Sequence, residues 1–137
     1  MTPPAAGGCQ CGAVRYRLTA PATWTGYCHC RMCQRAHGAP AVVWLTVPSD
    51  GIVFDRGAPQ WYRSSPEAER GFCTMCGSPL AWRPVATRGD DPGIDIAATT
   101  LDDSTAVAPQ MHLWCDSAMP WLAIDDHLPR KPQGRAS

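Results

Sequence analysis

CTMCG at residues 73–77 and CQCG at residues 9–12 are two short cysteine motifs that both end in a Cys-Gly pair. Cysteines one or two positions apart direct both sulfurs at one point, which suits a tetrahedral metal ion better than cross-links between distant segments. Glycine adopts a positive φ at little steric cost, so Gly12 and Gly77 allow tight turns in which backbone N–H groups face the sulfurs. The two turns are therefore predicted to form one closed structural zinc site, which pins the start of the chain to its middle. Its predicted ligands are Cys9, Cys11, Cys73 and Cys76.

A third motif, CHCRMC at residues 28–33, supplies three more of the 8 cysteines. Three protein ligands leave one coordination position free, and an open position distinguishes a catalytic zinc site from a structural one. We expect a second, catalytic zinc ion held by Cys28, Cys30 and Cys33, and we assign no catalytic residue beyond this site. Disulfides or a thioredoxin-like redox pair are the alternatives, and the spacings favour them less.

Four other side chains are candidates for a fourth ligand of the second site, but the ligand role is favoured for none of them. His29 is expected to point away from the ion and to bond to backbone or water. For His37, in the stretch QRAHGAP, a loop position near the cluster and a role as ligand are equally open. His112 and Cys115 share the apolar stretch MHLWC, where a cysteine is most often a small buried hydrophobe.

Composition limits the class of protein. A chain of 137 residues is long enough for one domain with a modest core, so we expect a single domain over residues 1–137. The 12 Lys and Arg balance the 12 Asp and Glu, and no basic stripe is present, which argues against nucleic acid as a partner. No stretch approaches the ~20 apolar residues of a membrane span, and no export signal is visible, so we expect a cytoplasmic protein without a membrane partner.

The remainder of the chain is typical of a β-rich protein broken by turns. Alternating, β-branched and aromatic residues predict strands, and no window shows the stripe of an amphipathic helix. DRGAPQ at residues 55–60 predicts a hairpin turn between its flanking strands. The Asp pairs 90/91, 102/103 and 125/126 are expected at solvated loop positions. The predicted strands cover residues 13–19, 39–47, 51–57, 59–64, 79–84, 93–101 and 111–115.

The order of the motifs resembles the glutathione-dependent formaldehyde-activating enzyme family, to which centromere protein V is also related. The resemblance rests on GGCQCGAVRY, CHCRMCQRAHGAP, YRSSPEAERGFCTMCGSPLAW and MHLWCDSAMPW, and it extends from about residue 8 to residue 129. It implies a mainly β fold in which several small antiparallel sheets form a tent around a structural zinc site, with flexible ends outside this core. It also implies the same division of the seven clustered cysteines between a structural and a catalytic zinc.

The family reaction implied by this resemblance is the addition of the glutathione thiol to formaldehyde, which gives S-hydroxymethylglutathione and is formally a carbon–sulfur lyase equilibrium. The expected partners are therefore a small thiol such as glutathione and a small aldehyde, while the oligomeric state is left open. The side chains that could meet carboxylates of an acidic thiol are Arg31, Arg35, Arg63 and Arg70. Two other classes remain as alternatives: a zinc-stabilised protein-binding module, and a redox or metal-handling protein that uses CHCRMC directly.

Overall fold

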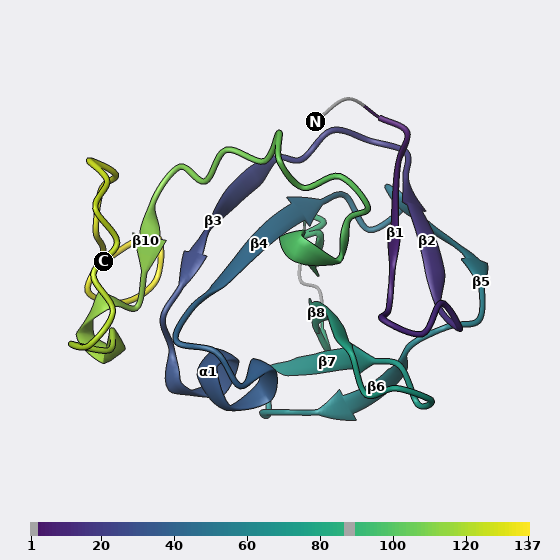
Figure 1. Cartoon of the computed structure of the whole chain (residues 1–137), viewed down its shortest axis with the longest axis horizontal. Coiled ribbons are helices and arrows are strands. Elements are labelled where there is room, and N and C mark those ends of the chain that lie inside the picture. The colour runs from purple at the N-terminus through teal and green to yellow at the C-terminus, as the bar shows by residue number, and fades with distance from the viewer. Residues whose placement is uncertain (1–2, 87–89) are drawn as a thin grey trace.

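The computed structural model describes residues 3–86 and 90–137, and over these residues the fold is mainly β. Figure 1 shows the strands along three sides of a triangle, with β1, β2 and β5 on one side, β3 and β4 on a second, and β6 and β7 along the base. The strands are β1 (Ala5–Gly8), β2 (Arg15–Leu18), β3 (Trp24–Cys28), β4 (Val42–Val47), β5 (Ile52–Arg56), β6 (Gln60–Arg63), β7 (Ala68–Phe72), β8 (Pro79–Pro84), β9 (Ile94–Ala97) and β10 (His112–Leu113). One α-helix, α1 (Arg31–His37), and two short 3₁₀ helices, η1 (Ala98–Thr100) and η2 (Cys115–Ser117), complete the described elements.

The strands form two sheets. The smaller has the order β1-β2-β5, and the larger has the order β10-β3-β4-β9-β8-β7-β6. All pairings are antiparallel except the short one between β10 and β3. The expectation of a mainly β fold with several sheets is confirmed.

The two faces of the larger sheet bury different clusters of side chains. Because successive side chains of a strand point to opposite faces, β4 contributes Leu45 and Val47 to one cluster and Trp44 to the other. The first cluster fills the space toward the smaller sheet and includes Tyr16 and Leu18, which are 1% and 0% exposed. The second is smaller and holds Cys28 and Cys33. The two groups of cysteines predicted from the sequence therefore lie on opposite faces of one sheet.

Several local expectations were wrong. The prediction of no helix fails at α1, because this helix has only seven residues and is too short to show a periodic stripe. Its ends carry local signals instead: the Cys30 sulfur accepts a hydrogen bond from the backbone N–H of Cys33, and Gly38 closes the helix with a φ of 60°. His37 is accordingly the last helical residue rather than a loop residue.

The predicted hairpin at residues 55–60 is also wrong, because β5 and β6 belong to different sheets and the turn with Gly57 at φ 58° leads from one sheet to the other. The predicted strand over 111–115 is paired only at His112–Leu113, since Trp114 takes a left-handed conformation and η2 follows. The strand predicted over 93–101 ends at Ala97, where η1 begins. Strands β1, β3 and β7 were not predicted, because glycine interrupts the alternation in each.

No helix among the described residues is long and apolar enough to cross a bilayer.

Candidate metal centres and their cavity

The sulfurs of Cys9, Cys11, Cys73 and Cys76 lie within 4.8 Å of one another. The first two thiols precede the turn at Gly12, which has a φ of 82°, and the other two precede Gly77, which has a φ of 79°. Both glycines therefore take the positive φ that the Cys-Gly pairs predicted. Backbone N–H groups also face the sulfurs, because Val14 donates to Cys9 Sγ at 3.2 Å and Met75 donates to Cys73 Sγ at 3.4 Å.

The spacing of these four sulfurs fits a tetrahedral metal ion. Cys11 Sγ lies 3.7 Å from Cys9 Sγ and 3.8 Å from Cys73 Sγ. A tetrahedron with metal–sulfur bonds of about 2.3 Å has edges of about 3.8 Å, whereas a disulfide would bring two sulfurs to about 2.05 Å. The group could therefore hold a metal ion with all four positions filled by the protein. Hydrogen bonds from the hydroxyl and the backbone N–H of Ser78 also lower the pKa of the Cys76 thiol to about 5, which favours the thiolate form that binds metals.

The second group consists of Cys28, Cys30 and Cys33, whose sulfurs also lie within 4.8 Å of one another. Cys28 ends β3, Cys30 caps α1 and Cys33 belongs to the first turn of that helix. Contacts with Cys28 and then Cys33 lower the pKa of the Cys30 thiol to about 2, and contacts with Cys30 and Cys33 raise the pKa of Cys28. Three thiols in contact thus favour a shared negative charge, which suits a cation. Among the residues that the structure describes, this group includes no fourth Cys, His, Asp or Glu.

The four alternative ligands have other roles or positions. His29 points toward β10, where its Nε2 lies 2.8 Å from Nδ1 of His112. His37 packs edge-on against Trp44 with ring centroids 5.2 Å apart. Cys115 lies in η2 and is half-buried.

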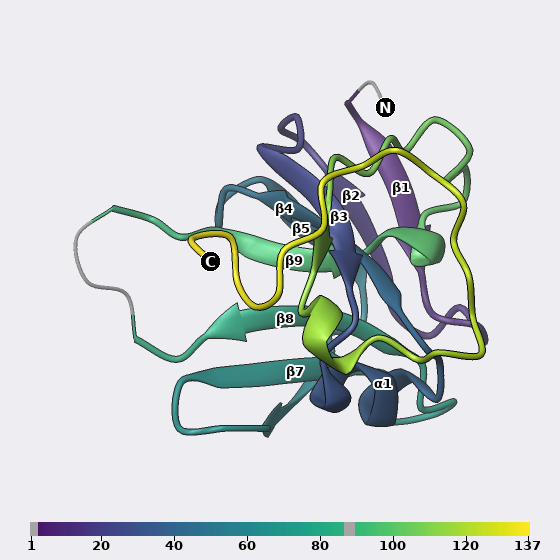
Figure 2. The ribbon, with the colours of Figure 1, turned by 90° about the vertical axis from the view of Figure 1, so that its left-hand side faces the viewer.

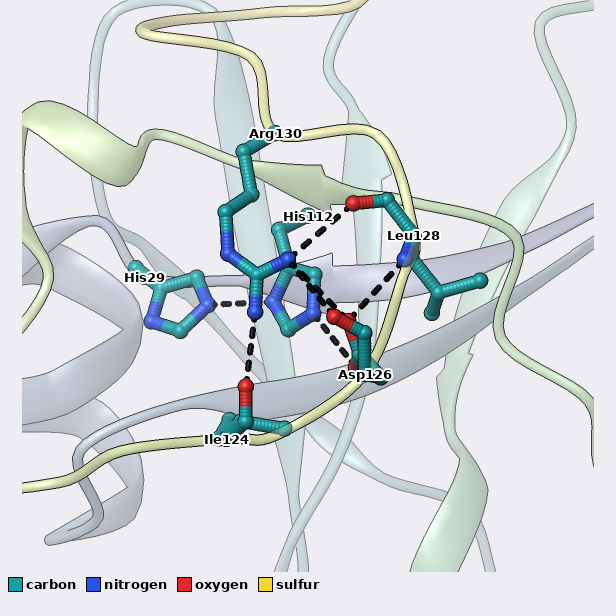
Figure 3. Close-up of polar contacts among 6 residues, drawn as sticks. All are labelled: His29, His112, Ile124, Asp126, Leu128 and Arg130. Atoms are coloured by element: carbon teal, nitrogen blue, oxygen red, sulfur yellow. Dashed lines mark hydrogen bonds and ion pairs between the residues drawn. The ribbon is translucent and has the colours of Figure 1, made fainter.

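The pair of histidines belongs to a hydrogen-bonded network that extends from the buried rings to the surface and is shown in Figure 3. Nε2 of His112 lies 2.9 Å from Oδ2 of Asp126, and Nη1 of Arg130 lies 3.1 Å from the other carboxylate oxygen. Tyr27 stacks on His112 with ring centroids 4.4 Å apart. His29 therefore bonds to another histidine, and burial followed by the charge of His112 lowers its pKa.

The three pairs of adjacent aspartates in the sequence differ in their surroundings. Asp126 lies in a loop as expected and is partly exposed, but its carboxylate is the acceptor of this network. Asp102 is exposed but pairs with Arg15, and Asp91 accepts from Ser49.

A cavity of about 510 Å³ opens beside the second cysteine group. Its walls are aromatic, and it also contains ionisable groups that the sequence analysis did not connect with the cysteines, above all Asp95 of β9. Tertiary structure alone brings these side chains together, because they come from six segments of the chain. The tryptophans and ionisable residues of the lining, apart from the three cysteines, are Trp24, Trp44, Trp82, Trp114, Arg31, Glu67, Arg70 and Asp95.

Arg70 is the positive charge closest to the second cysteine group. Its Nη2 and Nη1 atoms lie 3.5 and 3.6 Å from Cys33 Sγ, and its buried Nε has no hydrogen-bond partner among the described atoms. Of the other candidate arginines, Arg31 donates to Gln34 and Arg63 donates to backbone carbonyls of its own turn. Arg35 lines an adjoining cavity of about 630 Å³ that has no cysteine in its lining.

Comparison with known proteins agrees with the cysteine pattern and the fold. The family model described as glutathione-dependent formaldehyde-activating enzyme matches residues 4–117. The chain belongs to this family. The fold also resembles a crystal structure of a Rhodobacter sphaeroides protein from structural genomics, with a TM-score of 0.55 and 24% sequence identity over 76% of this chain and 91% of that one. No curated protein matches the chain significantly.

Proposed function

We propose that the protein is a zinc-dependent carbon–sulfur lyase that forms and cleaves thiol–aldehyde adducts, with glutathione and formaldehyde as the first substrates to test. The observation that carries the proposal is the group of three cysteines, without a fourth ligand from the described chain, at the wall of a cavity of about 510 Å³. Membership of the glutathione-dependent formaldehyde-activating enzyme family supports it.

The two cysteine groups suit two different roles for zinc. The group of Cys9, Cys11, Cys73 and Cys76 is closed by four thiols and lies partly in the main core, as expected of a structural ion. The group of Cys28, Cys30 and Cys33 offers three thiols beside the cavity, so it would leave one position of a tetrahedral ion for a substrate. A zinc ion there would accept the sulfur of a substrate thiol and lower the pKa of that thiol.

The reaction needs the thiol and the aldehyde to meet in one orientation. The sulfur electron pair forms the new carbon–sulfur bond, the carbonyl π pair moves to oxygen, and the proton released by the thiol ends on that oxygen. The tryptophan walls would exclude water and hold the two substrates together. Arg70 places its positive charge beside Cys33. This charge would stabilise the negative charge of the cysteine group.

The proposal is tested by NMR exchange spectroscopy of glutathione with ¹³C-formaldehyde, comparing wild-type protein with Cys30→Ser, with chelator-treated protein, and with Cys115→Ser as a matched cysteine control. We expect faster exchange between free and adduct signals with the wild type and Cys115→Ser than with the other two. The uncatalysed addition is itself rapid, so the comparison with these controls is what counts. Equal rates for all four proteins across several thiols and aldehydes would contradict the proposal and favour a zinc-stabilised binding module.

A further inference from the structure

Five side chains form a continuous row across the larger sheet on the face that carries the second cysteine group. The strand register pairs Trp24 of β3 with Thr46 of β4, Thr46 with Asp95 of β9, Asp95 with Trp82 of β8, and Trp82 with Arg70 of β7. Register partners point to the same face of a sheet. Four of the five, all except Thr46, line the same cavity as the three cysteines.

The end of this row near Trp24 has the chemistry of a cation site. The Thr46 hydroxyl donates to Asp95 Oδ1 at 2.6 Å, and no hydrogen bond from the described residues reaches the second carboxylate oxygen, which could accept from a ligand. Burial raises the pKa of Asp95, so a nearby positive charge would stabilise its ionised form. The indole face of Trp24 adds the ring quadrupole that attracts ammonium and guanidinium groups.

A cation from the chain itself already lies at this end. The guanidinium carbon of Arg135 lies 4.0 Å from the centre of the Trp24 ring, and its Nη2 donates to Thr46 Oγ1 at 3.1 Å. Arg135 makes no ion pair with Asp95 within 4.0 Å among the described residues, although its charge lowers the pKa of that carboxyl. Figure 2 shows the segment that carries Arg135 crossing in front of the sheet near β9.

Few contacts hold the Arg135 side chain at this end of the row. It is exposed, and its side chain has one hydrogen bond in the described structure, to Thr46. Among the described residues, the nearest backbone hydrogen bond that joins this segment to the rest of the protein runs from Trp114 N–H to the carbonyl of Gln133, at 2.9 Å. A ligand with a cationic group could therefore replace this guanidinium while residues 131–133 stay bound to β10 and η2.

We propose that Trp24, Thr46 and Asp95 form a subsite for an alkylammonium group of the substrate thiol, and that Arg135 occupies this subsite when no substrate is bound. The assignment to the substrate rests on the proposed function. Trp24 precedes Cys28 by four residues of the same strand, a distance of about 13 Å at about 3.3 Å per residue. The subsite thus selects thiols whose cationic group is many bonds from the sulfur, and short aminothiols cannot reach both ends.

The binding test uses hexylammonium as the probe and hexanol as its neutral counterpart, with zinc-loaded protein and the indole N–H resonances of the tryptophans as the readout. We expect hexylammonium to shift the Trp24 resonance and to bind at least about ten-fold more tightly than hexanol, a difference of about 1.4 kcal/mol. Arg135→Ala should strengthen hexylammonium binding several-fold because the tethered competitor is gone. Asp95→Asn should reduce the preference over hexanol to less than about three-fold, whereas Asp50→Asn, at an exposed turn, should leave it unchanged.

Equal binding of hexylammonium and hexanol, or no gain in Arg135→Ala, would overturn the subsite; Arg135→Ala decides the question even if Asp95→Asn fails to fold. A second arm compares adduct exchange for ω-aminothiols and ω-hydroxythiols of two to eight methylenes, and only the long aminothiols should gain over their hydroxyl counterparts. If hexylammonium binds as expected and no thiol shows accelerated exchange, the cation subsite stands and the proposed lyase function fails. If exchange is accelerated without any preference for long aminothiols, the function stands and the subsite's link to the substrate fails.

Discussion

Nε2 of His29 lies 2.8 Å from Nδ1 of His112, although 83 positions separate the two histidines in the chain. His29 stands between Cys28 and Cys30, and His112 is held on its other side by Asp126. Cys28 and Cys30 belong to the open group, which consists of Cys28, Cys30 and Cys33. The hydrogen bonds therefore connect the chain around these two cysteines to β10 and to the segment after β10 that contains Asp126. We expect this network to position the thiols rather than to contact a substrate.

His112→Phe tests this connection. Phenylalanine keeps a ring that can stack on Tyr27 but removes both hydrogen bonds, so His29 and Asp126 lose a buried partner. We expect a loss of about 2–4 kcal/mol in the free energy of unfolding and weaker metal binding at the second site. Urea denaturation and chelator competition measure the two effects. His127→Ala, at an exposed position, is the control, and equal losses in both variants would contradict a role for the network.

Cys73→Ser tests the closed group, which consists of Cys9, Cys11, Cys73 and Cys76. Cys73 is 1% exposed and lies in the main core, and structural zinc can supply on the order of 10 kcal/mol to folding. We expect this variant to unfold or aggregate, as judged by circular dichroism and size-exclusion chromatography, whereas Cys115→Ser should remain folded. A soluble, folded Cys73→Ser protein with full metal content would show that the closed group is not structural.

Cys30→Ser should leave the fold intact and empty the open group. Serine is itself a favourable N-cap residue, so α1 keeps its first hydrogen bond, and the closed group is untouched. Elemental analysis should show the loss of one metal ion per chain, with a melting temperature close to that of the wild type. A variant that melts as poorly as Cys73→Ser would instead make the second group structural.

Arg70→Ala removes the two N–H donors that face Cys33. Loss of a group that supports a metal ligand commonly weakens metal binding by about 10–100-fold, and we expect this at the second site only. Competition with a chromophoric chelator measures both sites separately. Arg63→Ala deletes an arginine of the neighbouring strand whose hydrogen bonds to the described residues go to carbonyls of its own turn, and a similar loss of affinity there would refute the specific role of Arg70.

Stability should fall as the pH falls from about 6.5 to about 4, in part through His37. Burial, followed by the charge of Arg70, lowers the pKa of His37 from its ordinary value of 6.5 to about 4, so the unfolded chain takes up this proton first. The contribution of His37 to the free energy of unfolding is therefore complete above about pH 6.5, and about 3 kcal/mol of it is lost by pH 4. His37→Gln should flatten the pH dependence of unfolding by this amount. Metal loss affects both proteins alike, so parallel curves for the two would rule out His37 as the source.

The sequence was informative where the chemistry is local. The spacing of Cys28, Cys30 and Cys33 within six residues brings the thiols together by chain connectivity alone, and this cluster is present in the structure. The matched Cys-Gly turns also predicted that Cys9 and Cys11 meet Cys73 and Cys76, because two half-sites of the same geometry complete one tetrahedron. Helix α1 was not predicted because the sequence signals for it are its two cap residues, Cys30 and Gly38, rather than a repeating pattern of apolar residues.

By itself, then, the sequence determined which cysteines cluster, that the chain is β-rich, and which family it belongs to. Only the tertiary structure decided what surrounds the thiols. Asp95 and Trp24 line the same cavity because of the order of strands in the sheet, and His29 bonds to His112 beside a parallel pairing that joins distant segments. The register of such pairings depends on the combined packing of both faces, as when Leu45 and Trp44 bury opposite sides of β4. A local sequence pattern does not determine this register, because each strand could pair with several others until the whole core is assembled.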